Sequence, residues 1–355
     1  MCQVFGTLFC LYVNLSNHKT THFTNSMNYI NRTSNIICDA ATIESLCHQH
    51  SSVTLFAYMR HMASQYLRQG KFRTSETYAT TLCSFKRYRN GKDLRLQDIT
   101  SDIVLEYESY LRNKSLSPNT ISFYIKHLRA VYNRAVEEGI LSDRHPFKRV
   151  KTSSSATPKR AVSLKTIKRI KDMELGSSPS RCFARDMFLF SFYTRGMSFV
   201  DIATLEKSNL KGSILYYRRK KTSQQLEIRL EKCMLDLISK YRSHPSSPYL
   251  LSVIDHELPN HRKQYLSCMS KVNRHLKSIG NELGLQHPLT MYCARHSWAS
   301  IARDEGIPLS VISEGMGHDS EKTTRIYLAS IRSEVIDQAN RKILKLLSSP
   351  LSSSL

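Results

Sequence analysis

One segment without any apolar period divides this sequence and limits the folds open to it. Residues 146–160 contain the run KRVKTSSSATPKR, which is dense in serine and basic residues and includes Pro158. Such a run cannot bury an apolar face, and this composition is typical of a linker. We therefore predict separate cores before and after it. This agrees with a length of 355 residues at roughly 100–200 residues per domain.

Charge is the second constraint. The chain has 52 Lys and Arg against 29 Asp and Glu, a formal net charge of +23. Hydrophobic residues make up 41%, which supports a buried core and argues against a wholly disordered chain. A mean hydropathy of −0.37 is too polar for a membrane protein. The excess of positive charge predicts a polyanionic partner, either nucleic acid or an anionic membrane surface, and charge alone does not separate the two.

The nine cysteines are scattered and contain no CxxC pair. This predicts reduced thiols in a cytoplasmic protein and no disulfide framework. The only metal-like cluster is Cys47–His50, whose spacing matches no standard zinc site. We expect no metal and no other cofactor.

The block at residues 51–145 has the periodicity of a small helical domain. Apolar residues recur at helical spacing from Leu55 to Tyr66, and Ser75–Arg89 is also compatible with a helix. The third predicted helix is capped by Ser117 and closed by Gly139. Residues 1–50, rich in Asn, Thr and Ser after a short apolar run, are predicted to be a poorly ordered extension.

The block at residues 161–347 mixes helices with a hairpin, and residues 348–355 form a tail. Phe183–Tyr193 predicts a buried helix, and Ser198 has the spacing of an N-cap with Asp201 at N3. Two strand-like runs, Ile214–Arg219 and Leu226–Leu230, flank a polar loop. The remainder is predicted to be helical and to end in an amphipathic segment at residues 335–347.

Three short strings near the end of the chain carry recognisable chemistry. They are YCARHSW at 292–298, GMGH at 315–318 and TTRIY at 323–327. Here the sequence resembles the tyrosine recombinase (phage-integrase-like) family. That family has a first arginine after a Gly-hydrophobic pair, a hairpin lysine, an HxxR box, a GH dipeptide and a tyrosine nucleophile nine residues after the histidine. His318 and Tyr327 have that interval, Arg295 closes the box, and Lys221 falls in the hairpin.

The resemblance, which spans residues 55–347, implies a mainly α, two-domain fold. A helical, SAM-like core-DNA-binding domain would be joined to an α+β catalytic domain with a small antiparallel sheet. It also implies a site-specific DNA recombinase, an integrase or invertase. Its partners would be duplex DNA at paired recombination sites, further copies of the chain in a tetramer, and accessory DNA-bending proteins. It implies no membrane partner and a cytoplasmic, nucleoid-associated location. The basic residues predicted to contact DNA are Lys126, Arg129, Arg134, Lys148, Arg149, Lys151, Lys159, Arg160 and Lys220.

The chemistry of the family explains these residue types. Tyr327 would attack the DNA phosphorus, form a 3′-phosphotyrosine and release a 5′-hydroxyl. Arg295 would clamp the nonbridging oxygens, and Lys221 would protonate the leaving oxygen. His318 would donate to a nonbridging oxygen or assist proton transfer. Thr323 and Thr324 are expected to cap or pack the helix that presents Tyr327.

The sequence departs from the family pattern at two positions. Ser198 stands where the family has its first arginine, and Tyr292 stands where it most often has histidine. A phenol can still donate to the phosphate. We favour Arg219 as the substitute cation, because strand periodicity would place it on the same face as Lys221, with Arg195 as the second choice. The altered arginine resembles a branch of integrases and invertases from conjugative mobile elements. Two alternatives stay open: a DNA-binding relative that lost activity at Ser198, and a type IB topoisomerase-like enzyme.

Overall fold

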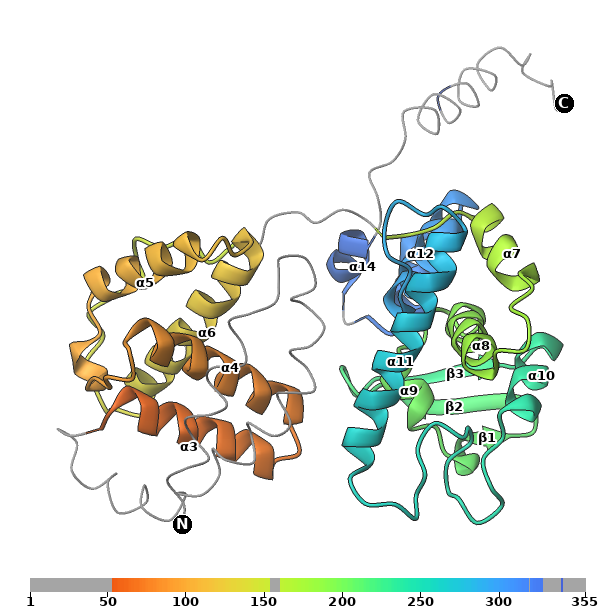
Figure 1. The fold of residues 1–355 in the computed structure, drawn as a ribbon, viewed down its shortest axis with the longest axis horizontal. Helices are drawn as coiled ribbons and strands as arrows, with labels where there is room; N and C mark the ends of the chain where they lie inside the picture. The colour runs from red at the N-terminus through yellow and green to blue at the C-terminus, as the bar shows by residue number, and fades with distance from the viewer. Residues whose placement is uncertain (1–52, 154–159, 319, 328–339, 341–355) are drawn as a thin grey trace, which may run out of the picture. The chain divides into compact units, whose positions relative to one another are not determined.

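The structure is a computed structural model, and it describes residues 53–153, 160–318, 320–327 and 340. Several predictions lie outside these residues: the extension at 1–50, the Cys47–His50 cluster, Lys159 and the tail at 348–355. The amphipathic segment at 335–347 also lies outside them, apart from residue 340. The chain divides into two compact units between residues 157 and 158 (Figure 1). None of the described helices is long and apolar enough to cross a lipid bilayer.

The first unit is helical. Its elements are α3 (Leu55–Arg68), α4 (Phe72–Tyr88), the 3₁₀ turn η1 (Leu96–Asp98), α5 (Ser101–Asn113) and α6 (Pro118–Glu137). The predicted start of α6 is confirmed, because the Ser117 side chain accepts a hydrogen bond from the Thr120 amide and Pro118 occupies the first turn. Gly139 follows α6 with φ +71°, a left-handed conformation that suits glycine.

Aromatic rings fill the core of this unit. Phe85 and Tyr107 are fully buried, with ring centroids 4.8 Å apart. Phe147 and Val150, which belong to the segment expected as linker, are also buried in this core. Phe147 packs on Tyr132 with centroids 5.7 Å apart. The ordered helical unit therefore extends past α6 to these residues.

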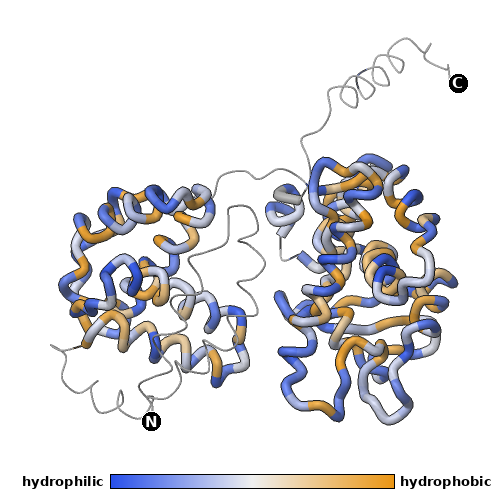
Figure 2. The backbone as a smooth tube through the Cα atoms, viewed as in Figure 1, coloured by the Kyte–Doolittle hydropathy of each residue, from blue (hydrophilic) through white to orange (hydrophobic). Residues whose placement is uncertain are grey.

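The second unit combines helices with a small sheet. Its helices are α7 (Leu164–Asp172), α8 (Pro179–Tyr193), α9 (Phe199–Ala203), the 3₁₀ turn η2 (Lys207–Asn209), α10 (Lys232–Lys240), α11 (His261–Glu282), α12 (Met291–Asp304), α13 (Leu309–Gly315) and α14 (Glu321–Tyr327). Helix α8 packs against α11 and α12. Its residues from Asp186 to Ser191 are buried, and the loops of the unit contain hydrophobic as well as hydrophilic stretches (Figure 2). The predicted buried helix is thus confirmed, with a start four residues before Phe183.

The sheet is antiparallel, in the order β1 (Leu210–Lys211), β2 (Ile214–Arg218), β3 (Gln225–Arg229). In β2 and β3 buried residues alternate with more exposed ones, as the period-two pattern predicts. Leu215 pairs with Ile228, and Tyr217 pairs with Leu226. The prediction of a mainly α, two-domain fold with a small antiparallel sheet is confirmed.

Candidate active site

Arg295 is held by backbone carbonyls at the centre of the second unit. It lies on α12, and its side chain is buried. Its Nη1 donates to the Gly196 carbonyl at 2.8 Å, and its Nη2 donates to the Met316 carbonyl at 2.6 Å. Gly196 has φ +75°, and a Cβ there would lie 2.7 Å from Cα of Arg295. Only glycine fits this approach, so the turn after α8 and α12 together fix the guanidinium.

His318 lies against this guanidinium. Its Nε2 is 2.8 Å from Nη2 of Arg295, and its Nδ1 is 2.8 Å from Oγ1 of Thr324. Burial lowers the pKa of His318 to about 3, with further lowering by the charges of Arg295, Arg219 and Lys221. The imidazole is therefore neutral near pH 7. It occupies the centre of a cluster of positive charge.

Arg219 joins the same cluster from the hairpin. Strand β2 ends at Arg218, and the Arg219 amide donates to the Gln224 carbonyl at 2.9 Å. The side chain of Arg219 is buried, and its Nη1 donates to the Gly317 carbonyl. Lys221 is exposed, two residues along the turn. The period-two argument that placed both residues on one face was therefore wrong, because the strand ends before them.

Gly317 is the contact point between the hairpin and the turn that precedes His318. Its carbonyl accepts from Arg219, and Oγ1 of Thr222 lies 3.4 Å from the same oxygen. It has φ +62°, and a Cβ would lie 2.7 Å from Cδ of Arg219 and 2.9 Å from Cδ1 of Leu226. Both the conformation and the close approach require glycine here.

Ser198 occupies the position of the family's first arginine, but its side chain makes structural contacts. It caps α9, as predicted, and its hydroxyl donates to Oδ2 of Asp201 at 2.6 Å. The other oxygen of this buried carboxylate accepts from the Lys220 amide at 2.9 Å. Asp201 thus ties the start of α9 to the base of the hairpin. The sequence predicted its place at N3 but gave no signal for the contact 19 residues away.

The remaining predicted catalytic residues lie around this cluster. Tyr292 on α12 is 50% exposed, and its ring packs edge-on against His296 with centroids 4.4 Å apart. Arg195 has φ +60°, and its Nη1 donates to the Glu227 carbonyl at 3.2 Å. Tyr327 is the last residue of α14, and this helix contacts α12 and α13. One turn before Tyr327, Thr324 connects α14 directly to His318.

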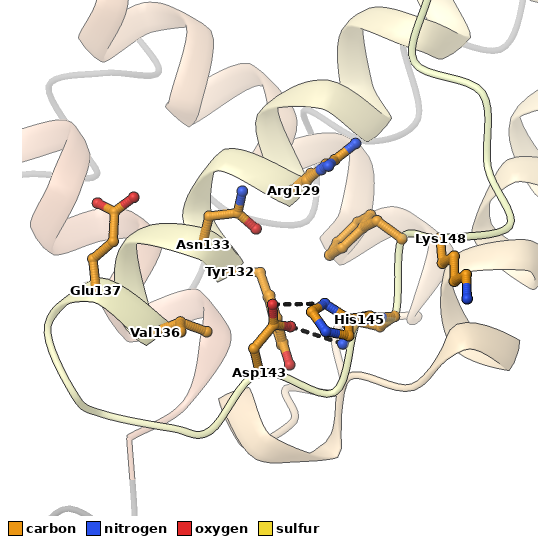
Figure 3. A pocket seen from close by; sticks show the side chains of 10 residues that line it. Arg129, Tyr132, Asn133, Val136, Glu137, Asp143, His145 and Lys148 are labelled. Carbon is orange, nitrogen blue, oxygen red and sulfur yellow. Dashed lines mark hydrogen bonds and ion pairs between the residues drawn. The ribbon is translucent and has the colours of Figure 1, made fainter.

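In the first unit, a pocket of about 650 Å³ lies beside α6. Two predicted DNA-contacting residues line it, Arg129 on α6 and Lys148 in the chain after α6 (Figure 3). His145 contacts Asp143 on the same wall, with Nδ1 2.8 Å from Oδ2. The side chains of Arg129 and Lys148 are exposed, and neither forms an ion pair with another residue that the structure describes.

Arg134 is placed differently from the other predicted DNA contacts. Its Nε donates to Glu138 at 2.7 Å, and its Nη2 donates to Gln65 on α3 at 3.0 Å. The guanidinium of Arg134 therefore already donates hydrogen bonds within the first unit. The other predicted basic residues that the structure describes are exposed: Lys126, Arg149, Lys151, Arg160 and Lys220. Within the described part of the chain, no three His, Cys, Asp or Glu side chains are arranged to hold a metal ion.

Comparison with known proteins gives two family matches. Residues 54–152 match the phage integrase SAM-like domain, and residues 163–334 match the phage integrase family. The tyrosine recombinase XerD of Listeria monocytogenes is 27% identical over 237 residues, which cover 64% of this chain and 76% of that protein. The tyrosine recombinase XerA of Thermococcus kodakarensis is 26% identical over 234 residues, 65% of this chain and 77% of that protein.

Solved structures share the fold. The integrase of transposon Tn1549, in complex with a circular intermediate DNA, matches with a TM-score of 0.60 at 15% identity, covering 83% of this chain and 100% of that one. A lambda integrase dimer bound to a core site matches with a TM-score of 0.57 at 15% identity, covering 86% and 85%. A lambda integrase tetramer bound to a Holliday junction matches with a TM-score of 0.57 at 17% identity, covering 80% of each chain.

Proposed function

The chain belongs to the phage integrase family and is a site-specific tyrosine recombinase, and we propose that it breaks and rejoins DNA at the Arg295–His318–Arg219 cluster with Tyr327 as the nucleophile. We expect Tyr327 to attack the phosphorus and leave a 3′-phosphotyrosine and a free 5′-hydroxyl. No external energy source is needed, since the covalent bond to the enzyme conserves the energy of the phosphodiester.

One observation carries this proposal. Arg219 and Arg295 are each about 5% exposed, and Arg219 donates to the Gly317 carbonyl. Among the residues that the structure describes, no carboxylate forms an ion pair with Arg219, and none accepts a hydrogen bond from its buried Nε. A buried guanidinium without a counter-charge is costly, which favours an anionic ligand at this place. A DNA phosphate has the charge and the oxygen geometry that two guanidinium groups bind.

We propose roles for five side chains in and around this cluster. Arg295 and Arg219 hold the two nonbridging oxygens, so that Arg219 supplies the charge that Ser198 cannot. Lys221, on the exposed turn, reaches the 5′-oxygen and protonates it as it leaves. Tyr292 donates a further hydrogen bond to the phosphate from its exposed position. Ser198 keeps a structural role through Asp201. Stabilising the developing charge with preorganised donors contributes about 2.7–4 kcal/mol per donor in acyl-transfer enzymes.

We further propose that the substrate is duplex DNA at paired recombination sites, on which four copies of the chain assemble. Supporting this is the likeness to the lambda integrase tetramer on a Holliday junction. The likeness to the Tn1549 transposon integrase supports an integrase or invertase of a mobile element. Such an enzyme works in the cytoplasm on nucleoid DNA. The exposed basic residues of the first unit, Arg129 and Lys148 among them, bind the backbone of the duplex.

A nicked suicide substrate tests the proposal. A duplex that the protein selects from random DNA is nicked next to the cleaved phosphate, so that the short product diffuses away and the covalent complex accumulates. The wild-type protein is expected to give a complex that resists denaturation, and Tyr327→Phe is expected to bind the same duplex without forming it. Binding without a covalent complex in the wild type would favour the non-catalytic alternative. Relaxed plasmid without recombinants would favour the topoisomerase-like alternative.

A further inference from the structure

Thr324 is fully buried at a point where the helix of the nucleophile meets the arginine cluster. Its exposed fraction is 0%, and its Oγ1 lies 2.8 Å from Nδ1 of His318. It stands three residues before Tyr327 in α14, a helix of seven residues. The proposed roles of Arg295 and Tyr327 give it no task.

The hydrogen bonds of His318 define which ring nitrogen carries the proton. A guanidinium has only donors, so Nε2 of His318 accepts from Nη2 of Arg295 at 2.8 Å. In the neutral ring the proton is then on Nδ1, and Nδ1–H donates to Oγ1 of Thr324. The opposite tautomer would point an N–H at the N–H of Arg295 and leave Nδ1 facing Thr324 as an acceptor.

We propose that Thr324 is a positioning residue: by accepting from Nδ1–H, it holds the His318 ring in the orientation in which Nε2 accepts from Arg295. This inference rests on the proposed function, because it concerns the side chains that would bind the phosphate. The contact also lies on α14, so Thr324 reaches His318 only when α14 is docked. Docking of the nucleophile's helix and positioning of the His318 ring beside Arg295 are then one event. A protomer whose α14 is undocked lacks both the nucleophile and the positioned histidine.

Two substitutions separate the hydrogen bond from the packing. Thr324→Val keeps the shape of the side chain and removes the acceptor, while Thr324→Ser keeps the acceptor. Thr323→Val is the matched control, because the Thr323 hydroxyl is 3.3 Å from that of Ser320 and does not reach His318. Loss of a hydrogen-bond partner that orients a functional histidine costs about 10–100-fold in metal sites. We expect a loss of about that size in the rate of covalent-complex formation for Thr324→Val at saturating DNA, with rescue by Thr324→Ser and an unchanged DNA affinity.

A second readout does not depend on activity. With ¹⁵N-labelled histidine, the His318 resonances, assigned by their loss in His318→Gln, report the tautomer of the folded protein. We expect a hydrogen-bonded Nδ1–H signal in the wild type, Thr324→Ser and Thr323→Val, and loss of that signal in Thr324→Val, where the acceptor is missing. A wild-type Nδ1–H signal in Thr324→Val would overturn the inference, whatever the cleavage rate of this variant. So would a wild-type rate in that variant. Failure of the wild type to form any covalent complex would instead refute the proposed function, and the Nδ1–H signal would still decide the role of Thr324.

Discussion

Arg295 and His318 are 23 residues apart in the sequence and share a buried hydrogen bond of 2.8 Å between Nη2 and Nε2. The imidazole accepts this bond as a neutral ring, within a group of cations that would repel a protonated one. The same pair lies between the Gly196 turn and the helix of Tyr327.

The neutral state of His318 predicts how stability depends on pH. Its pKa is lowered to about 3 in the folded protein, against about 6.5 in an unfolded chain. Between these values the unfolded state binds a proton that the folded state does not bind, so stability decreases as the pH falls. From pH 6.5 to about 5.5, the wild type is expected to lose about 1 kcal/mol more unfolding free energy than His318→Gln.

Trp298 makes this measurement specific for the second unit. It is the only tryptophan of the chain and lies on α12, three residues after Arg295. Urea unfolding followed by its fluorescence at several pH values gives both free energies. Parallel losses in the wild type and the variant would contradict a neutral His318.

Arg219 is predicted to be needed for cleavage and not for binding. Arg219→Ala removes one guanidinium from the proposed phosphate site, and loss of one such donor costs roughly 100–1,000-fold in comparable sites. The control is Arg195→Asn, because Asn tolerates the positive φ of this position. Rates of covalent-complex formation at saturating DNA should fall by that range for Arg219→Ala only. Wild-type cleavage by Arg219→Ala, or an equal loss in Arg195→Asn, would refute the assignment.

Gly317→Ala is predicted to impair cleavage, because the added Cβ would clash with Arg219 and Leu226 in addition to straining the backbone. Gly317 and Gly306 both have positive φ, but an added Cβ meets Arg219 and Leu226 at Gly317 and meets nothing within 4 Å at Gly306. Each substitution should cost roughly 1–2 kcal/mol from backbone strain. Cleavage should be lost in Gly317→Ala alone. Equal cleavage rates in the two variants, at matched thermal stability, would show that the contact between hairpin and turn is dispensable.

Salt dependence tests the basic pocket of the first unit. If Arg129 and Lys148 neutralise phosphates, each change to alanine should reduce the slope of log affinity against log salt by about 0.9. Arg112→Ala on α5 is the control, since Arg112 is already paired with Glu108 at 2.7 Å. Affinities measured by fluorescence anisotropy at four salt concentrations give the slopes. An unchanged slope in Arg129→Ala and Lys148→Ala would show that these two side chains do not contact the DNA phosphates.

Local signals in the sequence predicted those elements that local interactions determine. The cap at Ser117 and the glycine after α6 act within one turn, and the alternation in β3 depends only on neighbouring residues. Helix α5 (Ser101–Asn113) was missed, although Thr100 caps it and its buried residues recur at helical spacing. The helical periodicity was present in Ser101–Asn113, but the sequence analysis did not consider this segment.

The contacts that assemble the site could not be predicted from local sequence patterns. Arg219 reaches the Gly317 carbonyl across 98 residues, and Asp201 reaches the Lys220 amide across 19. Neither contact leaves a pattern in the local sequence. The motif resemblance placed Arg295 and His318, because their spacing is characteristic. The proposed substitution of Arg219 for the missing arginine depends on where strand β2 ends, and the tertiary contacts of the hairpin determine that end.

The central claim is that Tyr327 becomes covalently joined to DNA, and mass spectrometry of the trapped complex tests it most directly. After nuclease and trypsin digestion, cleavage after Arg325 and Arg332 gives the peptide at residues 326–332, in which Tyr327 is the only tyrosine. We expect this peptide to carry a nucleotide on Tyr327 through its 3′-phosphate. A nucleotide on another residue, such as Tyr292, or a trapped complex without any modified tyrosine, would contradict the account.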